Sequence, residues 1–203
     1  MAEGAMSLCA ARWRRPAASQ HPLLMRRCRR TFSQTPDVSS AAVLVSDAAA
    51  RRRKGLDFEA QVVTLMRTFQ CDLRATQQSN DGGIDHQGVW RLPDLEVEVV
   101  TQCKNESKPV GVQALREFHG VLSFFPSNAV GVFASASGYS IYAQRYFLRM
   151  PHAAVLCTIE STRLSTFLLN DRAQTLLPKL TVGTIFVNRD HELVLTYGDQ
   201  VLG

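Results

Sequence analysis

The sequence predicts an α/β protein, in which a mixed β-sheet carries helices on both faces and a β-hairpin follows at the C-terminal end. Three patterns predict this fold. Apolar residues recur at helical spacing over 52–69, polar and apolar residues alternate over 95–104, and short unbroken apolar runs occupy 129–134 and 153–159. Alternation indicates a strand with one buried face, whereas an unbroken run is typical of a strand buried on both faces. The predicted order is α-β-β-β-α-β-α-β-α, followed by the hairpin.

The first helix is predicted over about 52–69. Four apolar side chains form its stripe, at i, i+4, i+7 and i+11: Phe58, Val62, Leu65 and Phe69. Three strands are predicted next, over 71–78, 84–90 and 95–104, because turn-forming Gly, Pro, Asn and Asp separate them.

The second half of the chain alternates helices with buried strands. The predicted elements are a helix over about 110–124, a strand over 129–134, a helix over 141–148, a strand over 153–159 and a helix over 161–170. A hairpin with a four-residue loop at 188–191 then joins 184–187 to 192–196. Because an exposed strand edge can pair with another chain, we regard the hairpin at 184–197 as a candidate homodimer edge.

Charge is distributed unevenly along the chain. Residues 1–54 hold 11 Arg and Lys against 3 Asp and Glu, whereas residues 55–203 hold 12 against 15. The basic character therefore belongs to the N-terminal segment and gives no support to nucleic-acid binding by the remainder.

The N-terminal segment is rich in Arg, Ser and Ala and nearly free of acidic residues. This composition predicts a mitochondrial transit peptide over 1–32, cut between Phe32 and Ser33, and hence a location in the mitochondrial matrix. A linker is predicted over 33–50. The alternative is a basic arm that stays attached and binds nucleic acid. No apolar run approaches the ~20 residues of a membrane-spanning helix, so no membrane span is expected.

The number and spacing of the cysteines argue against two kinds of structural cross-link. Outside the predicted transit peptide the chain has three cysteines, Cys71, Cys103 and Cys157, and no C-x-x-C spacing. An odd number at these distances indicates neither a disulfide framework nor a zinc site. Buried apolar roles are the simpler interpretation.

The chemistry of the chain is concentrated in two short motifs. Asp81-Gly82-Gly83-Ile84-Asp85 forms a turn before a strand, and Gln102-Cys103-Lys104 ends the next strand. Residues i and i+2 of a strand share a face, so Gln102 and Lys104 share one while Cys103 faces the other way. A carboxylate and an amide oxygen beside a lysine point to metal-assisted phosphodiester hydrolysis. Alternatively, the aspartates cap a glycine turn and the strand residues are ordinary surface groups.

Several motifs in order resemble the Mrr-like type IV restriction endonucleases of the PD-(D/E)xK superfamily. They are Gly55-Leu56-Asp57-Phe58-Glu59, the two motifs above, Leu115-Arg116-Glu117-Phe118, and Ser137-Gly138-Tyr139-Ser140 before a helix that contains Ala143. The resemblance covers roughly 54–160 and implies a nuclease domain over 51–160 with a restriction-endonuclease-like α-β-β-β-α-β core. Residues 161–203 are then a C-terminal helix and hairpin packed on the same domain. With its N-terminal segment, the chain is also similar to the fungal mitochondrial family called required for respiratory growth protein 7.

The resemblance implies roles for individual residues. Asp85, Gln102 and the backbone carbonyl of Cys103 would bind Mg²⁺ or Mn²⁺, and Glu59 would bind the metal or orient water. Lys104 would hold the attacking water and stabilise negative charge. The implied substrate is nucleic acid, with DNA favoured over RNA, in genome maintenance that supports respiratory growth.

Other residues are candidates for binding nucleic acid. They are Lys108, Arg116, Ser137 and Ser140, the two serines either binding phosphate at a helix N-terminus or simply capping that helix. Two further functions stay open. One is a nuclease-fold module that binds DNA or RNA without cutting it, and the other is an assembly factor for mitochondrial gene expression.

Overall fold

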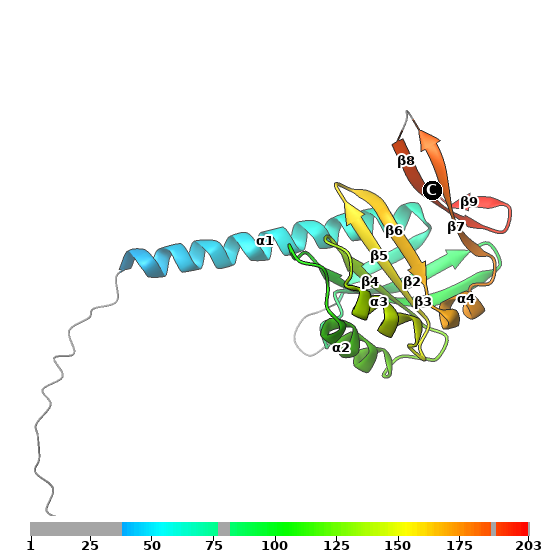
Figure 1. Ribbon diagram of the computed structural model, residues 1–203, viewed down its shortest axis with the longest axis horizontal. Coiled ribbons are helices and arrows are strands. Elements are labelled where there is room, and N and C mark those ends of the chain that lie inside the picture. Colours follow the sequence, from blue (N-terminus) through cyan, green and yellow to red (C-terminus); the bar gives the residue numbers. More distant parts are fainter. Residues whose placement is uncertain (1–37, 77–81, 188–189, 203) are drawn as a thin grey trace, which may run out of the picture. The chain divides into compact units, whose positions relative to one another are not determined.

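The computed structural model describes residues 38–76, 82–187 and 190–202. The predicted transit peptide and Asp81 lie outside the described residues. Figure 1 shows the elements, which are α1 (Val38–Thr68), β1 (Cys71–Ala75), β2 (His86–Leu92), β3 (Leu95–Lys104), α2 (Val112–Leu122), β4 (Val130–Ser135), α3 (Ile141–Leu148), β5 (Ala154–Glu160), β6 (Arg163–Leu169), α4 (Asp171–Leu176), β7 (Leu180–Val187), β8 (Asp190–Tyr197) and β9 (Gln200–Leu202).

A six-stranded mixed sheet in the order β1-β2-β3-β4-β5-β6 forms the centre of the fold. Its first three strands form an antiparallel meander, β3, β4 and β5 run parallel, and β6 closes the far edge antiparallel. The α1 helix packs on one face of the sheet, and α2 and α3 pack on the other. The predicted fold class, a mixed sheet with helices on both faces, is confirmed.

Each face of the sheet has its own apolar core. The C-terminal half of α1 buries Phe58, Val62 and Met66 at i, i+4 and i+8 against the sheet. On the other face, α2 and α3 bury their apolar sides against the alternate residues of β3, β4 and β5. Trp90 of β2 is fully buried on the α1 side, where its indole Nε1 donates to the carbonyl of Phe69 at 2.7 Å.

The first helix is longer than its apolar stripe predicts. It begins at Val38 rather than near residue 52, so the predicted linker is helical over 38–50. This stretch holds five alanines, and alanine has the highest intrinsic helix propensity. Its Ser- and Ala-rich composition resembles a linker, but Ala favours the helix once the stripe downstream has nucleated it. None of the described helices combines the length and apolar character needed to cross a bilayer.

The predicted helix over 161–170 is wrong, because Arg163–Leu169 is strand β6. Ser161 and Thr162, at φ values of 48° and 73°, make a tight reversal after β5. A register shift follows, in which β5 residues 158 and 159 pair with β6 residues 166 and 164. The extra residue in β6 places Leu164 and Phe167 on the same buried side although they are three positions apart. A bulged strand therefore reproduces helical spacing in the sequence.

The C-terminal part forms a second sheet, β7-β8-β9. The predicted hairpin is present, but its strands are longer and pair as far as Val187 with Asp190, so its loop is shorter than four residues. Leu195, Tyr197 and Leu202 are buried in the same apolar cluster as Trp90.

Candidate active site

Strand β3 carries polar residues to its carboxyl end. Val97, Val99 and Cys103 pack on the α1 side, and Val100 packs on the α2 side. The pleat therefore directs Gln102 and Lys104 to the α2 side of the sheet. Gln102 is buried and Lys104 is half-buried.

Asp85 lies just before β2 and is fixed at this same end of β3. Its backbone N–H donates to the carbonyl of Thr101 at 2.9 Å, and its own carbonyl accepts from the N–H of Thr76 at 3.0 Å. Its Oδ2 accepts from the backbone N–H of Cys103 at 2.6 Å. The carboxylate is thus held over the end of the strand that bears Gln102 and Lys104.

The backbone of Cys103 adds a further oxygen to this end of the sheet. In a strand, the N–H and C=O of one residue point to the same side. Because the N–H of Cys103 reaches Asp85, its carbonyl also points toward the side where Asp85 lies. This orientation is compatible with the carbonyl acting as a ligand. The thiol packs with the α1 core, and burial, followed by the charge of Asp85, raises its pKa well above the usual value.

Glu59 brings a second carboxylate from α1. Burial raises its pKa, and the negative charge of Asp85 raises it further, so the two carboxylates are close enough to repel each other. The helix is tied to the end of β3 by Asn105, whose Nδ2 donates to the carbonyl of Lys54 at 2.9 Å. A cation between the two carboxylates would relieve the repulsion.

Gln102 is held beneath the glycine turn. Gly83 has a φ of 87°, and a Cβ on it would stand 2.9 Å from Nε2 of Gln102. Only glycine combines this backbone conformation with so close an approach. The other side-chain atom, Oε1, is buried without a hydrogen-bond partner among the described residues. Because a buried polar atom normally has a partner, this Oε1 calls for an explanation.

The groups present suit a hard cation. Two carboxylates, an amide oxygen and a backbone carbonyl are oxygen ligands of the kind that Mg²⁺ and Mn²⁺ accept. Within the part of the chain that the structure describes, no group of three or more His, Cys, Asp or Glu side chains is placed to hold a metal ion. A cation here would therefore need the neutral oxygens of Gln102 and Cys103 as well as the carboxylates.

The candidate phosphate-binding serines make structural hydrogen bonds. Ser140 caps α3, its Oγ accepting from the N–H of Ala143 at 3.3 Å. Ser137 Oγ donates to the carbonyl of Lys108 at 2.6 Å. Tyr139 lies between them in the sequence; its hydroxyl donates to the carbonyl of Phe133 at 2.6 Å, and the half-buried residue packs against the α2 and α3 core.

The two candidate cations differ in their surroundings. Arg116, on α2, places its guanidinium carbon 5.7 Å from the centre of the Tyr146 ring. Lys108 is exposed in the loop that follows β3. Of the remaining polar residues of β3, Glu98 accepts from Nε2 of Gln87 at 2.6 Å, so it is engaged away from Asp85.

Sequence reasoning missed Asn105 and Thr76. Asn105 joins β3 to a helix residue 51 positions earlier. The Thr76 hydroxyl donates to the carbonyl of Ile84 at 2.6 Å and thereby holds the segment that enters Asp85. Neither contact has a local sequence signal. Only the position of Asn105, directly after the lysine of the motif, could have drawn attention to it.

A family model and a curated relative are similar to the chain. The family model Mrr_cat, described as "Restriction endonuclease", matches residues 50–164, which is more than half of the chain. The uncharacterised mitochondrial protein C824.03c of Schizosaccharomyces pombe is 24% identical over 140 residues, which are 66% of this chain and 57% of that protein.

Two solved structures are also similar to the chain. The MspJI restriction endonuclease, in complex with a 27-mer oligonucleotide, is 19% identical with a TM-score of 0.42, covering 66% of this chain and 32% of that one. The DNA modification-dependent restriction endonuclease AspBHI is 20% identical with a TM-score of 0.43, covering 68% and 37%. The chain therefore spans about a third of these two proteins. On the strength of the family match, this chain belongs to the Mrr_cat family of restriction endonucleases.

Proposed function

We propose that the chain is a mitochondrial, metal-dependent nuclease that hydrolyses phosphodiester bonds of DNA. One observation carries the proposal. Asp85 is bonded to the end of the strand that bears Lys104 and Gln102, and Oε1 of Gln102 has no hydrogen-bond partner among the described residues. Burial, and then the charge of Asp85, raise the pKa of Glu59. Carboxylates with perturbed pKa values beside a lysine are characteristic of functional sites, where a cation or a substrate joins them.

The chemistry follows from the groups present. When bound, Mg²⁺ or Mn²⁺ would supply positive charge at a non-bridging oxygen of the phosphate. A water oxygen attacks the phosphorus, the bond to the leaving oxygen breaks, and that oxygen takes a proton from solvent. Glu59 takes the proton of that water, for which its raised pKa suits it. Lys104 stabilises the negative charge that develops on the phosphate.

The neutral Gln102 sets the strength of metal binding. With a glutamine rather than a third acid in the group, the ligands carry fewer negative charges. We expect the cation to bind weakly to the free protein and more firmly once a phosphate is present, since the phosphate adds the missing negative charge.

Cleavage assays test the proposal directly. The 203-residue chain would be incubated with supercoiled DNA, linear DNA and RNA, in Mg²⁺, Mn²⁺ or EDTA. Asp85→Ala and Lys104→Ala should each lower the rate by about 10²-fold or more. Matched controls are Asp72→Ala and Lys179→Ala, which remove exposed charges that pair with Arg91 and Asp94. The controls should cut like the wild type.

Absence of metal-dependent cutting by the wild type would refute the nuclease, as would equal cutting by wild type and Asp85→Ala. Loss of cutting in the controls would attribute the effect to folding rather than to the site. Faster cutting of RNA than of DNA would overturn the substrate preference.

A second candidate function is a nuclease-fold protein that binds nucleic acid without cutting it. The glutamine in place of an acid favours it, because a weakly bound cation is a poor catalyst. Tight, salt-dependent binding of DNA by a wild type that does not cut would select this function.

The proposed matrix location rests on the N-terminal composition and on the name of the mitochondrial relative. Import into isolated mitochondria, followed by mass spectrometry of the new N-terminus, should find Ser33 as the first residue. A product that keeps residues 1–32 would contradict the predicted cut. Support of respiratory growth and homodimer formation stay predictions, to be tested by gene deletion and by light scattering.

A further inference from the structure

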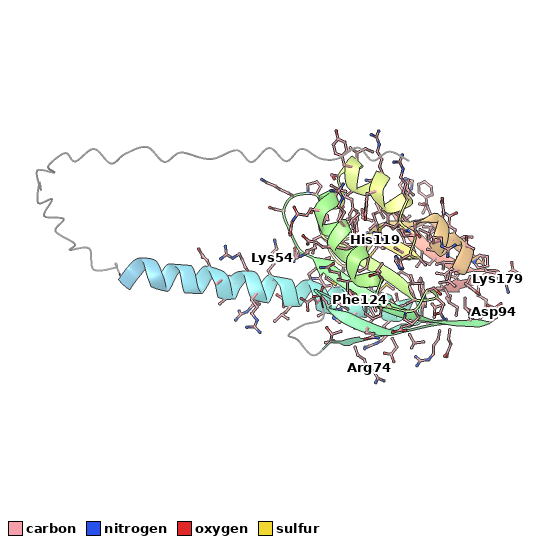
Figure 2. All side chains as sticks on the ribbon, turned by 90° about the horizontal axis from the view of Figure 1, so that it is seen from below. Lys54, Arg74, Asp94, His119, Phe124 and Lys179 are labelled. Atoms are coloured by element: carbon pink, nitrogen blue, oxygen red, sulfur yellow. The ribbon has the colours of Figure 1, made fainter. Side chains whose placement is uncertain are left out.

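The basic turn, which we define as residues 51–54 (Arg51, Arg52, Arg53 and Lys54), belongs to the helix that carries Glu59. All four residues are exposed. The charge count along the sequence assigns them to the N-terminal segment, but α1 is continuous from Val38 to Thr68. The folded domain therefore has a concentrated positive charge close to its candidate active site. In Figure 2, Lys54 lies where α1 leaves the body of the domain.

A hydrogen bond fixes the basic turn beside the end of β3. The Nδ2 of Asn105 donates to the carbonyl of Lys54 at 2.9 Å, and Asn105 directly follows Lys104. The loop after β3 adds the exposed Lys108. Glu106 is the acidic residue of that loop.

Helical geometry distinguishes the members of the basic turn. Residues seven apart lie two turns apart on nearly the same side of a helix. Arg52 is seven residues before Glu59, and Arg51 is seven residues before Phe58, which is 3% exposed against the sheet. Both arginines therefore lie on the side of α1 that faces the sheet and the site. Arg53 falls on the opposite side of the helix.

We propose that Arg51 and Arg52 bind the phosphate backbone of the nucleic acid whose scissile phosphate lies at Asp85 and Lys104. The proposal rests on the proposed function for the position of that phosphate. Arg52 and Glu59 are about 10 Å apart along the helix axis, which is about three base-pair rises of a duplex. Two arginines at this distance suit a flanking phosphate, which a guanidinium binds through paired hydrogen bonds.

A pair of double variants tests the proposal. Arg51→Ala/Arg52→Ala removes two charges from the site side of α1. Arg53→Ala/Arg67→Ala removes two exposed charges from its outer side and is the matched control. Alanine preserves the helix in both. The affinity of each full chain for a fluorescent duplex would be measured in EDTA, where no cutting occurs, over about 50 to 200 mM salt.

A strong effect is expected only from the double variant on the side of α1 that faces the site. Loss of Arg51 and Arg52 should lower the slope of log affinity against log salt by about two and weaken binding about tenfold or more at the lowest salt. The control pair should show less than half of either effect. Arg51→Lys/Arg52→Lys should restore the slope, which separates lost charge from altered folding.

The outcomes keep the two proposals apart. Equal effects of the two double variants, or no binding of duplex by the wild type, would overturn the arginine contact. If the chain binds DNA through Arg51 and Arg52 but does not cut it, the contact stands and the nuclease fails. If it cuts in a metal-dependent manner while both double variants bind equally, only the contact fails.

Tighter selective binding of duplex RNA would assign the same backbone contact to RNA. Selective loss of binding to cardiolipin vesicles, with DNA binding unchanged, would overturn it in favour of a membrane surface.

Discussion

Two buried side-chain amides in this domain differ in how fully they are bonded. Asn170 uses all of its groups: its Oδ1 accepts from the N–H groups of Ala154 and Ala173, and its Nδ2 donates to the carbonyls of Met150 and His152. Gln102 is also buried, at 8% exposure, yet its Oε1 has no hydrogen-bond partner among the described residues. The first amide joins β5 to α4, and the second ends the strand that carries Lys104.

This difference distinguishes polar residues that stabilise the fold from polar residues that act in a functional site. A polar residue kept for stability has all its hydrogen bonds within the protein, because each unmet one costs free energy. A buried polar group keeps an unmade hydrogen bond only where a bound ligand or ion completes it, or where the surrounding structure allows no better arrangement. Four measurements, on the two amides and on the His152 side chain, test this distinction.

The largest effect is expected at Asn170. Asn170→Ala would leave the two N–H donors and two carbonyls without partners and would remove the cap of α4, costing about 3 kcal/mol of unfolding free energy. Urea denaturation measures the loss. Cleavage by the folded fraction should be unchanged. A loss under about 1 kcal/mol would show that water replaces the amide and would weaken the comparison.

A smaller, metal-dependent effect is expected from Gln102→Glu. A further carboxylate at this end of β3, where Asp85 is bound, should lower the free energy of unfolding by about 2 kcal/mol without metal, because buried like charges repel. Mg²⁺ should restore the stability, and the rise of melting temperature with Mg²⁺ should exceed that of the wild type. The same rise in both proteins would place the cation elsewhere.

Gln102→Met should change stability by less than about 1 kcal/mol in either direction. Methionine has nearly the shape of glutamine but no polar group, so it leaves no unmet hydrogen bond. Metal-dependent cutting should fall sharply, since an oxygen ligand is lost. Urea denaturation measures the stability, and cleavage of supercoiled DNA measures the activity. Destabilisation as large as that of Asn170→Ala would make Gln102 a structural residue.

An effect confined to acidic pH, and absent near neutrality, is expected at His152, whose Nδ1 is the other buried side-chain atom without a partner among the described residues. Burial lowers its pKa, and the neighbouring His119 and Arg172 lower it further. The fold therefore favours the neutral ring, and its contribution to stability is lost as pH falls below about 6.5, the value in the unfolded chain.

His152→Gln should flatten the dependence of unfolding free energy on pH between about 5 and 6.5, by at most about 1.4 kcal/mol per pH unit for one proton. The exposed His191→Gln is the control, and neither variant should affect cutting. Loss of cutting in His152→Gln would extend the functional site to this region.

The sequence predicted the centre of the fold well, for a physical reason. Strand β3 and helix α3 have the predicted limits, because their side chains alternate or repeat without interruption and turn residues bound them. Strand β6 was missed because a bulge imitates helical spacing and because Ser161-Thr162 is not a usual pair for a turn with positive φ. The start of α1 was missed because its alanines are equally common in linkers.

For the candidate site, local motifs were sufficient only in part. The strand alternation predicts that Gln102 and Lys104 share a side, and the turn motif predicts where Asp85 enters. Three features depend on packing between distant segments: the raised pKa of Glu59 near Asp85, the buried Oε1 that lacks a partner among the described residues, and the bond from Asn105 to Lys54. The last of these turns the apparently separate basic run into a neighbour of the site.

Burial of Trp90 has a practical consequence for all of these experiments. The chain has two tryptophans, and Trp13 precedes the predicted cut at Ser33, so the processed protein would contain Trp90 alone. Its indole lies in the α1 core, fully shielded from water and bonded to the carbonyl of Phe69. Emission from such an indole is blue-shifted and moves to longer wavelength when water reaches it. The protein thus contains its own optical reporter of whether α1, the helix that bears Glu59, stays docked on the sheet.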